Sequence, residues 1–138
     1  MGMEHIRTMD NVCDCVIVRD DSVLLLWKIK PEHYVFPGGK VDPAESLEVT
    51  AMREAKEEIG CDIWIMKYLG GVSFQYNGKI FHAHQYLAKI PPGHEPVAKE
   101  PDVFDHLIWM PLGDYPKYSL DERVREFCED VREGKLIL

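Results

Sequence analysis

The chain has 138 residues, of which 46% are hydrophobic, and a formal net charge of −8. That length predicts one domain over residues 1–138, burying about two thirds of the surface that the unfolded chain exposes. The acidic balance argues against a stable nucleic-acid partner, and the lack of an apolar run of about 18–20 residues or a signal-peptide core predicts a cytoplasmic protein without a membrane partner. The cysteines form no CxxC pair and are predicted to be reduced core residues: Cys13, Cys15, Cys61 and Cys128.

The first predicted elements are strands. Residues 12–19 and 23–29 alternate in a way that predicts a β-hairpin, with Asp20 and Asp21 at its turn. A short strand is expected to end at Phe36. The chain therefore begins with sheet.

A helix follows. Asp42 is predicted to cap it, with Pro43 at its first position and Glu45 three residues on, and the helix is expected to end before Gly60. Small and apolar residues recur at four-residue spacing, with a methionine beside them, and predict the face that packs on a core: Leu47, Ala51, Ala55, Ile59 and Met52.

The second half of the chain repeats strand and helix signals. Residues 63–74 and 80–90 flank Asn77-Gly78, a pair typical of a type I′ hairpin turn. Residues 103–110 are predicted as a strand, and a capping box that starts at Ser119 predicts a last helix up to Gly134. Strands interleaved with two helices predict an α/β fold with sheet layered between helices.

Three glutamates of the first helix carry the functional argument. Glu54, Glu57 and Glu58 share one side of a helix, where like charges oppose one another by about 0.2–0.5 kcal/mol per pair. Arg53 and Lys56 are expected to be rotated off this side and to screen it only in part. A divalent cation such as Mg²⁺ or Mn²⁺ would suit these hard oxygen ligands. The alternative is a solvated acidic face, and the residues alone leave it open.

Residues 39–61 resemble the Nudix box, G-x5-E-x7-R-E-U-x-E-E-x-G-U. The seven fixed glycine and polar positions agree: Gly39, Glu45, Arg53, Glu54, Glu57, Glu58 and Gly60. The two U positions, normally bulky aliphatic residues, hold Ala55 and Cys61, and residues 34–38 resemble the strand and turn that lead into the box. The resemblance implies a Nudix-type α/β/α sandwich with a mixed β-sheet.

The same resemblance implies an Mg²⁺-dependent hydrolase, or one using Mn²⁺, that cleaves a phosphoanhydride bond in a nucleoside diphosphate derivative. It implies that the Gly39 carbonyl, Glu57 and Glu58 hold the metal and that Glu54 is a ligand or the base that activates water. Arg53 would orient these carboxylates. Arg53, Glu54 and Glu57 are thus the expected catalytic residues. Glu45, counted along the predicted helix, lies far from Glu54 and fits a structural role at least as well.

Outside the box, Glu100 is expected to be a further metal ligand, because family members place an extra carboxylate in a loop there. Asp102 and Asp105 are its neighbours, and a solvated loop acid is the alternative for each of the three. His82 and His84 share one strand face, and partnered structural histidines are favoured over metal ligands.

Aromatic residues are the candidates for substrate binding. We expect Tyr34, Phe36 and Tyr76 to stack on a nucleobase, while Trp27 and Phe74 share that possibility and core packing explains such residues without a ligand. Tyr76 lies near where dinucleoside polyphosphate hydrolases carry a tyrosine, and the proline that ADP-ribose hydrolases place there is absent. A nucleoside triphosphate pyrophosphohydrolase fits this length equally well.

A second class of function stays open. Some proteins with this fold bind a nucleotide as a sensor or scaffold without turnover, but they commonly lose box carboxylates, and all are present here. The intact set favours an enzyme, with an ADP-ribose-type pyrophosphatase as a further alternative. The expected partner is a small-molecule nucleotide, and a homodimer remains open.

Overall fold

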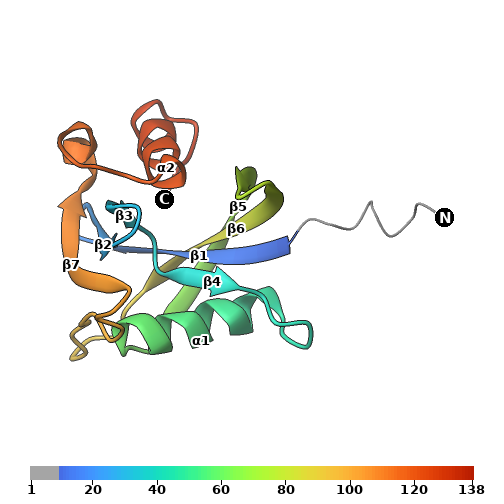
Figure 1. The fold of residues 1–138 in the computed structure, drawn as a ribbon. Coiled ribbons are helices and arrows are strands. Elements are labelled where there is room, and N and C mark those ends of the chain that lie inside the picture. Colours follow the sequence, from blue (N-terminus) through green and yellow to red (C-terminus); the bar gives the residue numbers. More distant parts are fainter. Residues whose placement is uncertain (1–9) are drawn as a thin grey trace.

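The computed structural model describes residues 10–138 and has two helices that lie on opposite sides of a mixed sheet (Figure 1). The strands are β1 (Asp10–Arg19), β2 (Ser22–Lys28), β3 (His33–Val35), β4 (Gly38–Lys40), β5 (Trp64–Tyr76), β6 (Lys79–Lys89) and β7 (Phe104–Pro111). The helices are α1 (Leu47–Ile59), the 3-10 helix η2 (Leu112–Lys117) and α2 (Glu122–Arg132). No helix within residues 10–138 is both long and apolar enough to cross a membrane.

The sheet has the order β3-β2-β1-β6-β5, with β4 paired to β1 and β7 paired to β2. The β1–β6 pair is parallel and the other pairs are antiparallel, so the sheet is mixed. Both predicted hairpins are confirmed. Their turn residues adopt positive φ, at 50° and 62° for Asp20 and Asp21 and at 51° and 76° for Asn77 and Gly78, as a type I′ turn requires.

The core has one layer on each face of the sheet. Alternate side chains of β1 point to opposite faces, so Cys13 and Cys15 pack with α1 while Val16 packs with α2. The expected helix face is confirmed for Ala51, Ala55 and Ile59, which are fully buried, and Leu47 packs at the edge of the same layer. The α/β/α architecture is therefore the one expected.

All four cysteines are buried free thiols, which confirms their assignment as reduced core residues. Two of them fasten α1 to β1. Cys13 Sγ donates to the Leu47 carbonyl at 3.2 Å, and Cys15 Sγ donates to the Ala51 carbonyl at 3.3 Å. Burial raises the pKa of the Cys13 thiol to about 12 and raises that of Cys15 as well, so both thiols stay protonated.

The predicted start of α1 was wrong. Ser46 is the N-cap, and its Oγ accepts from the Val49 N–H at 3.2 Å. Asp42 instead begins a turn in which its carbonyl accepts from the Glu45 N–H at 3.0 Å. Pro43 and Glu45 therefore lie in the loop before the helix. From this loop the Glu45 side chain turns back toward the first turns of α1.

Met52 was also placed wrongly, because its side chain is 40% exposed while Thr50 is fully buried. Thr50 Oγ1 donates to Glu45 Oε1 at 2.7 Å, which satisfies the hydroxyl inside the fold. The buried face of the helix thus extends from Ala51 toward Thr50, on the flank of the stripe opposite to Met52.

The predicted start of α2 was wrong as well. The N-cap is Asp121, whose carboxylate accepts from the Arg123 N–H at 3.2 Å. Residues 119–121 are extended beside β3, because the Tyr34 N–H donates to the Ser119 carbonyl at 2.8 Å and the Asp121 N–H donates to the Tyr34 carbonyl at 3.0 Å. This pairing with β3 delays the helix.

The two possible caps of α1 can be separated by mutation. Ser46→Ala should lower the free energy of unfolding by about 0.5–2 kcal/mol, because it removes the side-chain acceptor from the first turn. Asp42→Ala should change it by less than about 0.5 kcal/mol, as expected for an exposed loop position. Urea unfolding of both variants checks this, and a larger loss for Asp42→Ala would return the cap to residue 42.

Candidate active site

Arg53 joins three glutamates at the solvent side of α1. Its Nε and Nη2 donate to the two carboxylate oxygens of Glu45 at 2.7 and 3.0 Å. Its Nη1 donates to Glu54 Oε2 at 2.7 Å and lies 3.3 Å from both oxygens of Glu57. Of the three helix glutamates Arg53 thus contacts Glu54 and Glu57 but not Glu58, in agreement with the expectation that it screens them only in part. Because α1 begins at Leu47, Glu45 lies in the preceding loop, toward which helical side chains point.

Glu45 is held as an anion in this network. Its hydrogen bonds from Arg53, and then the one from Thr50, lower its pKa to about 2. Glu45 thus remains ionised at neutral pH and fixes two of the guanidinium nitrogens. Its contacts are those of a residue that positions Arg53, in line with the structural role considered for it.

Glu58 occupies a different environment from the other two helix glutamates. It is 5% exposed, and its Oε1 accepts from the Gly38 N–H at 2.9 Å. Within residues 10–138 no cationic side chain comes within ion-pair distance of it. Burial raises the pKa of Glu58, and the nearby carboxylates of Glu54 and Glu100 raise it further.

Glu54 reaches the same glycine pair. A Cβ placed on Gly39 would lie only 2.5 Å from the Glu54 carboxyl carbon, so a side chain at residue 39 would displace the Glu54 carboxyl group from this position. Burial raises the pKa of Glu54, and Arg53 opposes that shift. Two carboxyl groups thus meet the backbone of Gly38 and Gly39 in a partly dry environment.

The donor set here suits a hard divalent cation. Glu54, Glu58 and the Gly39 carbonyl supply oxygen atoms, which Mg²⁺ and Mn²⁺ prefer, and the carboxyl group of Glu58 lacks a cationic partner among the described residues. No three acidic, histidine or cysteine side chains in residues 10–138 already converge on one point. Glu57, 49% exposed in its side chain, contacts Arg53.

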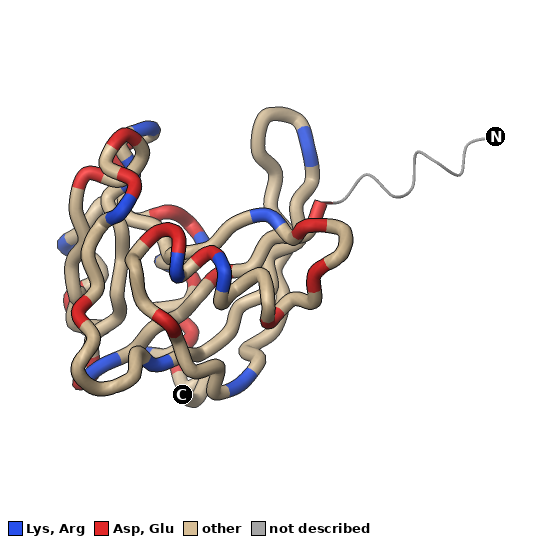
Figure 2. Tube along the Cα trace, turned by 90° about the horizontal axis from the view of Figure 1, so that it is seen from below, with Lys and Arg blue, Asp and Glu red and all other residues tan. Residues whose placement is uncertain are grey.

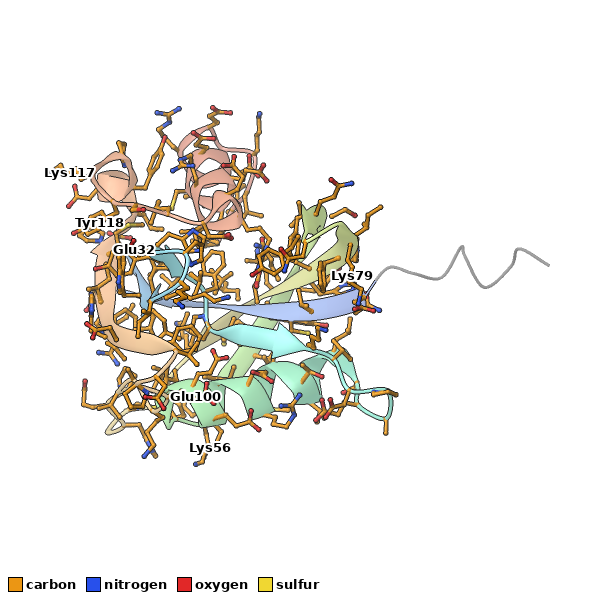
Figure 3. The ribbon with its side chains drawn as sticks, viewed as in Figure 1. Glu32, Lys56, Lys79, Glu100, Lys117 and Tyr118 are labelled. Carbon is orange, nitrogen blue, oxygen red and sulfur yellow. The ribbon has the colours of Figure 1, made fainter. Side chains whose placement is uncertain are left out.

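Glu100 approaches this region from a loop. The Lys99 N–H donates to the Glu58 carbonyl at 2.9 Å, which ties the loop to the end of α1, and Glu100 lies beside the helix (Figure 3). Its side chain is exposed. Asp102 is exposed too, and Asp105 pairs with His106 at 2.9 Å. Of the three loop acids, Glu100 is the one whose charge acts on Glu58.

A cavity of about 620 Å³ opens on the other side of Gly38 and Gly39, between the sheet, the tip of the β5–β6 hairpin and the start of α2. Its lining includes four cationic side chains, Lys28, Lys40, Lys79 and Arg123, and three acidic ones, Asp14, Asp121 and Glu122. Lys40 and Lys79 both approach Asp10 Oδ2, at 3.8 and 3.3 Å, and Lys79 lies beside the start of β1 (Figure 3). Elsewhere, acidic and basic segments are interspersed (Figure 2). The cavity thus offers cations next to the carboxylates.

The three expected substrate-binding aromatics are not gathered in one place. Tyr76 is 56% exposed and lines the cavity, and Phe36 lines it while being only 5% exposed. Tyr34 is not part of the lining. Its hydroxyl hydrogen-bonds with His106 Nε2 at 2.8 Å and its ring packs edge-on against Trp27, because side chains alternate along β3.

Sequence reasoning missed an ion pair at the floor of the cavity. Asp14, 2% exposed, accepts from Arg123 Nε and Nη2, each at 2.9 Å, and from Gln85 Nε2 at 3.2 Å. Burial opposes the charge of Arg123, but its bonds to Asp14 outweigh this and raise its pKa. An aspartate inside the apolar run of residues 12–18 was a signal that could have been used. Arg123 is 109 positions away and gave none.

The two strand histidines have hydrogen-bonding partners, as expected of structural residues. His84 bonds with Tyr68 at 2.9 Å and with Asn11 at 3.0 Å, and His82 bonds with Ser73 at 3.2 Å. Both nitrogens of the His84 ring are therefore engaged within the sheet.

Comparison with known proteins places these features in a family. A NUDIX domain model matches residues 9–131. YtkD of Bacillus subtilis, provisionally named an 8-oxo-dGTP diphosphatase, is 38% identical over 65% of this chain and 54% of its own length. The CTP pyrophosphohydrolase of Escherichia coli is 30% identical over 56% of this chain and 61% of its own. The chain thus spans less than two thirds of these curated relatives.

A solved structure gives a fuller match. The MutT NUDIX hydrolase from Burkholderia pseudomallei is 33% identical, with a TM-score of 0.77, and the match covers 88% of this chain and 97% of the other. The two proteins therefore share their fold over most of this chain.

The buried carboxyl group of Glu58 leads to a stability prediction. In metal-free protein at pH 8, Glu58→Gln should leave the melting temperature unchanged or raise it by a few °C, on the order expected for about 1 kcal/mol, because a neutral amide costs less to bury than a carboxylate. Glu57→Gln is the control, since that exposed side chain should change stability by less than about 0.5 kcal/mol. Calorimetry with EDTA checks both, and a large loss for Glu58→Gln would show that its charge holds the fold.

Proposed function

This chain belongs to the NUDIX family, and we propose that it is a metal-dependent hydrolase that cleaves a phosphoanhydride bond in a nucleoside diphosphate derivative. One observation carries the proposal: the carboxyl groups of Glu54 and Glu58 meet the Gly38–Gly39 backbone at the edge of a cavity with four cationic side chains. Carboxylates can hold a cation, and the cations can attract the phosphates of a nucleotide. Both needs of diphosphate hydrolysis are met within one region.

The cofactor that fits is Mg²⁺, with Mn²⁺ as the alternative. Glu54, Glu58 and the Gly39 carbonyl would hold it, and the box resemblance and the loop beside α1 make Glu57 and Glu100 the proposed further ligands. When bound, such a cation neutralises negative charge on the phosphate oxygens. Everything else must come from the side chains of the chain itself.

Arg53 sets the orientation of the proposed base. It holds Oε2 of Glu54 at 2.7 Å, so Oε1 is left either to hold the cation or to accept a proton from the attacking water. A carboxyl group whose pKa is raised by burial is a better proton acceptor than an exposed one. Lys40 and Lys79, at the mouth of the cavity, would bind phosphate oxygens in place of Asp10.

The substrate proposal is a small-molecule nucleotide. The two curated relatives carry the names of enzymes that act on a nucleoside triphosphate, which supports such a substrate here, and a dinucleoside polyphosphate is the second candidate because Tyr76 stands at the rim. A sensor without turnover is the alternative from another class. Chromatographic detection of the nucleotide products formed from a panel of nucleoside triphosphates, oxidised nucleotides, dinucleoside polyphosphates and ADP-ribose, with and without Mg²⁺, separates these functions.

Activity should depend on the helix carboxylates. Glu57→Gln and Glu58→Gln keep the side-chain shape but remove a charge each, so turnover at limiting Mg²⁺ should fall at least about 100-fold. Lys56→Gln is the matched control on the same helix, because Lys56 points away from the sheet (Figure 3) and pairs with Asp62. Steady-state kinetics on the best substrate checks this. Wild-type turnover in both glutamate variants would exclude the assignment.

Tyr76 tests the dinucleoside substrate. If its ring stacks on a base, Tyr76→Ala should raise KM about 5- to 150-fold with little change in kcat, since base stacking is worth about 1–3 kcal/mol in ground and transition states alike. Tyr76→Phe should be nearly silent because stacking needs only the ring. Trp64→Ala, at the far end of β5, controls for loss of an exposed aromatic residue. An unchanged KM in Tyr76→Ala would show that Tyr76 has only a structural role in the hairpin, and it would favour the smaller nucleotides as substrates.

A further inference from the structure

The Asp14–Arg123 pair lies deeper in the cavity than the phosphate-binding edge. In the β1–β4 register Asp14 is the partner of Gly38, and its side chain points to the α2 face of the sheet. The helix carboxylates reach Gly38 and Gly39 from the α1 face. A nucleotide with its phosphates at the β4 edge would therefore extend its base toward Arg123.

Arg123 is held in one orientation and still has donors to spare. Asp14 takes its Nε–H and one Nη2–H, while its guanidinium lies 4.1 Å from the centre of the Phe74 ring. An arginine carries five N–H donors in a planar fork. The end of this fork, formed by the remaining Nη1 and Nη2 hydrogens, is left for a ligand, with Asp121 3.6 Å from Nη1 at one side.

Stacking on Phe74 is already taken up by the protein. Its ring contacts the Arg123 guanidinium and also stacks on Phe81, with centroids 5.2 Å apart and planes inclined by 15°. Phe81 in turn is only 7% exposed. A base that enters this part of the cavity is therefore met by the hydrogen-bonding edge of Arg123 rather than by a free ring of Phe74.

We propose that Arg123 selects the nucleobase, favouring a base with two adjacent hydrogen-bond acceptors. This inference rests on the proposed function, in that the cavity must take a nucleotide. Guanine offers O6 with N7, and cytosine offers O2 with N3, and either pair matches the end of a guanidinium fork. Adenine and uracil present no such adjacent pair. Asp14, with Gln85, is a positioning residue that holds the fork in register.

Binding of GMP, CMP, AMP and UMP to the metal-free protein tests this without any catalytic step. Isothermal titration calorimetry should show that GMP, CMP or both bind about 5- to 150-fold more tightly than AMP and UMP, the discrimination expected of a bidentate contact. Comparing GMP with CMP identifies which base is selected. Equal affinities, or no binding of any monophosphate, would overturn the proposal.

Variants separate selection from a structural role of the ion pair. Arg123→Lys keeps a charge but lacks the fork, and Asp14→Asn keeps Arg123 but loses its anchor, so both should reduce the preference toward equality while AMP affinity changes little. Arg132→Lys, on the same helix and outside the cavity, should keep the preference. Circular dichroism establishes folding. A variant that retains the wild-type preference overturns the proposal, and if neither folds, the wild-type monophosphate series decides it.

The proposed hydrolysis can fail independently of this inference. A wild-type protein that selects among the monophosphates but hydrolyses no member of the nucleotide panel with Mg²⁺ would support base selection by Arg123 in a nucleotide-binding protein. A protein that hydrolyses all four triphosphates equally, and binds the four monophosphates equally, would keep the hydrolase and exclude the selection.

Discussion

The close approach of β4 to α1 is the constraint on which the rest of the site depends. At Gly38 a Cβ would collide with the Cys13 carbonyl of β1, and at Gly39 it would collide with the carboxyl group of Glu54. Glycine at both positions lets one backbone segment touch the sheet on one side and the acidic helix on the other. The helix carboxylates and the cavity therefore both border this one glycine segment.

Arg53 and Arg123 solve opposite electrostatic problems. Arg53 is shared among three glutamates near the surface. Its single positive charge does not neutralise three carboxylates, so the group keeps a net negative charge. Arg123 is paired in the interior with one aspartate, and burying either alone would be costly. The first arrangement leaves charge available for a cation, and the second leaves directional donors with little net charge.

Local patterns were sufficient where a feature depends on neighbours in the chain. The two hairpin turns followed from Asp20-Asp21 and Asn77-Gly78, and the buried face of α1 followed from its four-residue spacing. The predicted start of α2 failed because residues 119–121 pair with the distant strand β3. The predicted start of α1 failed because two local signals competed: Asp42 closes a turn with Glu45, and Ser46 caps the helix. The Asp14–Arg123 pair joins two ends of the chain, and no local spacing could predict it.

The two thiols that fasten α1 to β1 make the motion of the acidic helix observable. A thiol reacts with an alkylating reagent as its thiolate, and Cys13 and Cys15 are both buried and protonated while they donate to the Leu47 and Ala51 carbonyls. They become reactive when the helix separates from the strand. The rate at which these thiols are alkylated therefore measures how often α1, which carries the carboxylates, separates from β1, and it does so without any turnover.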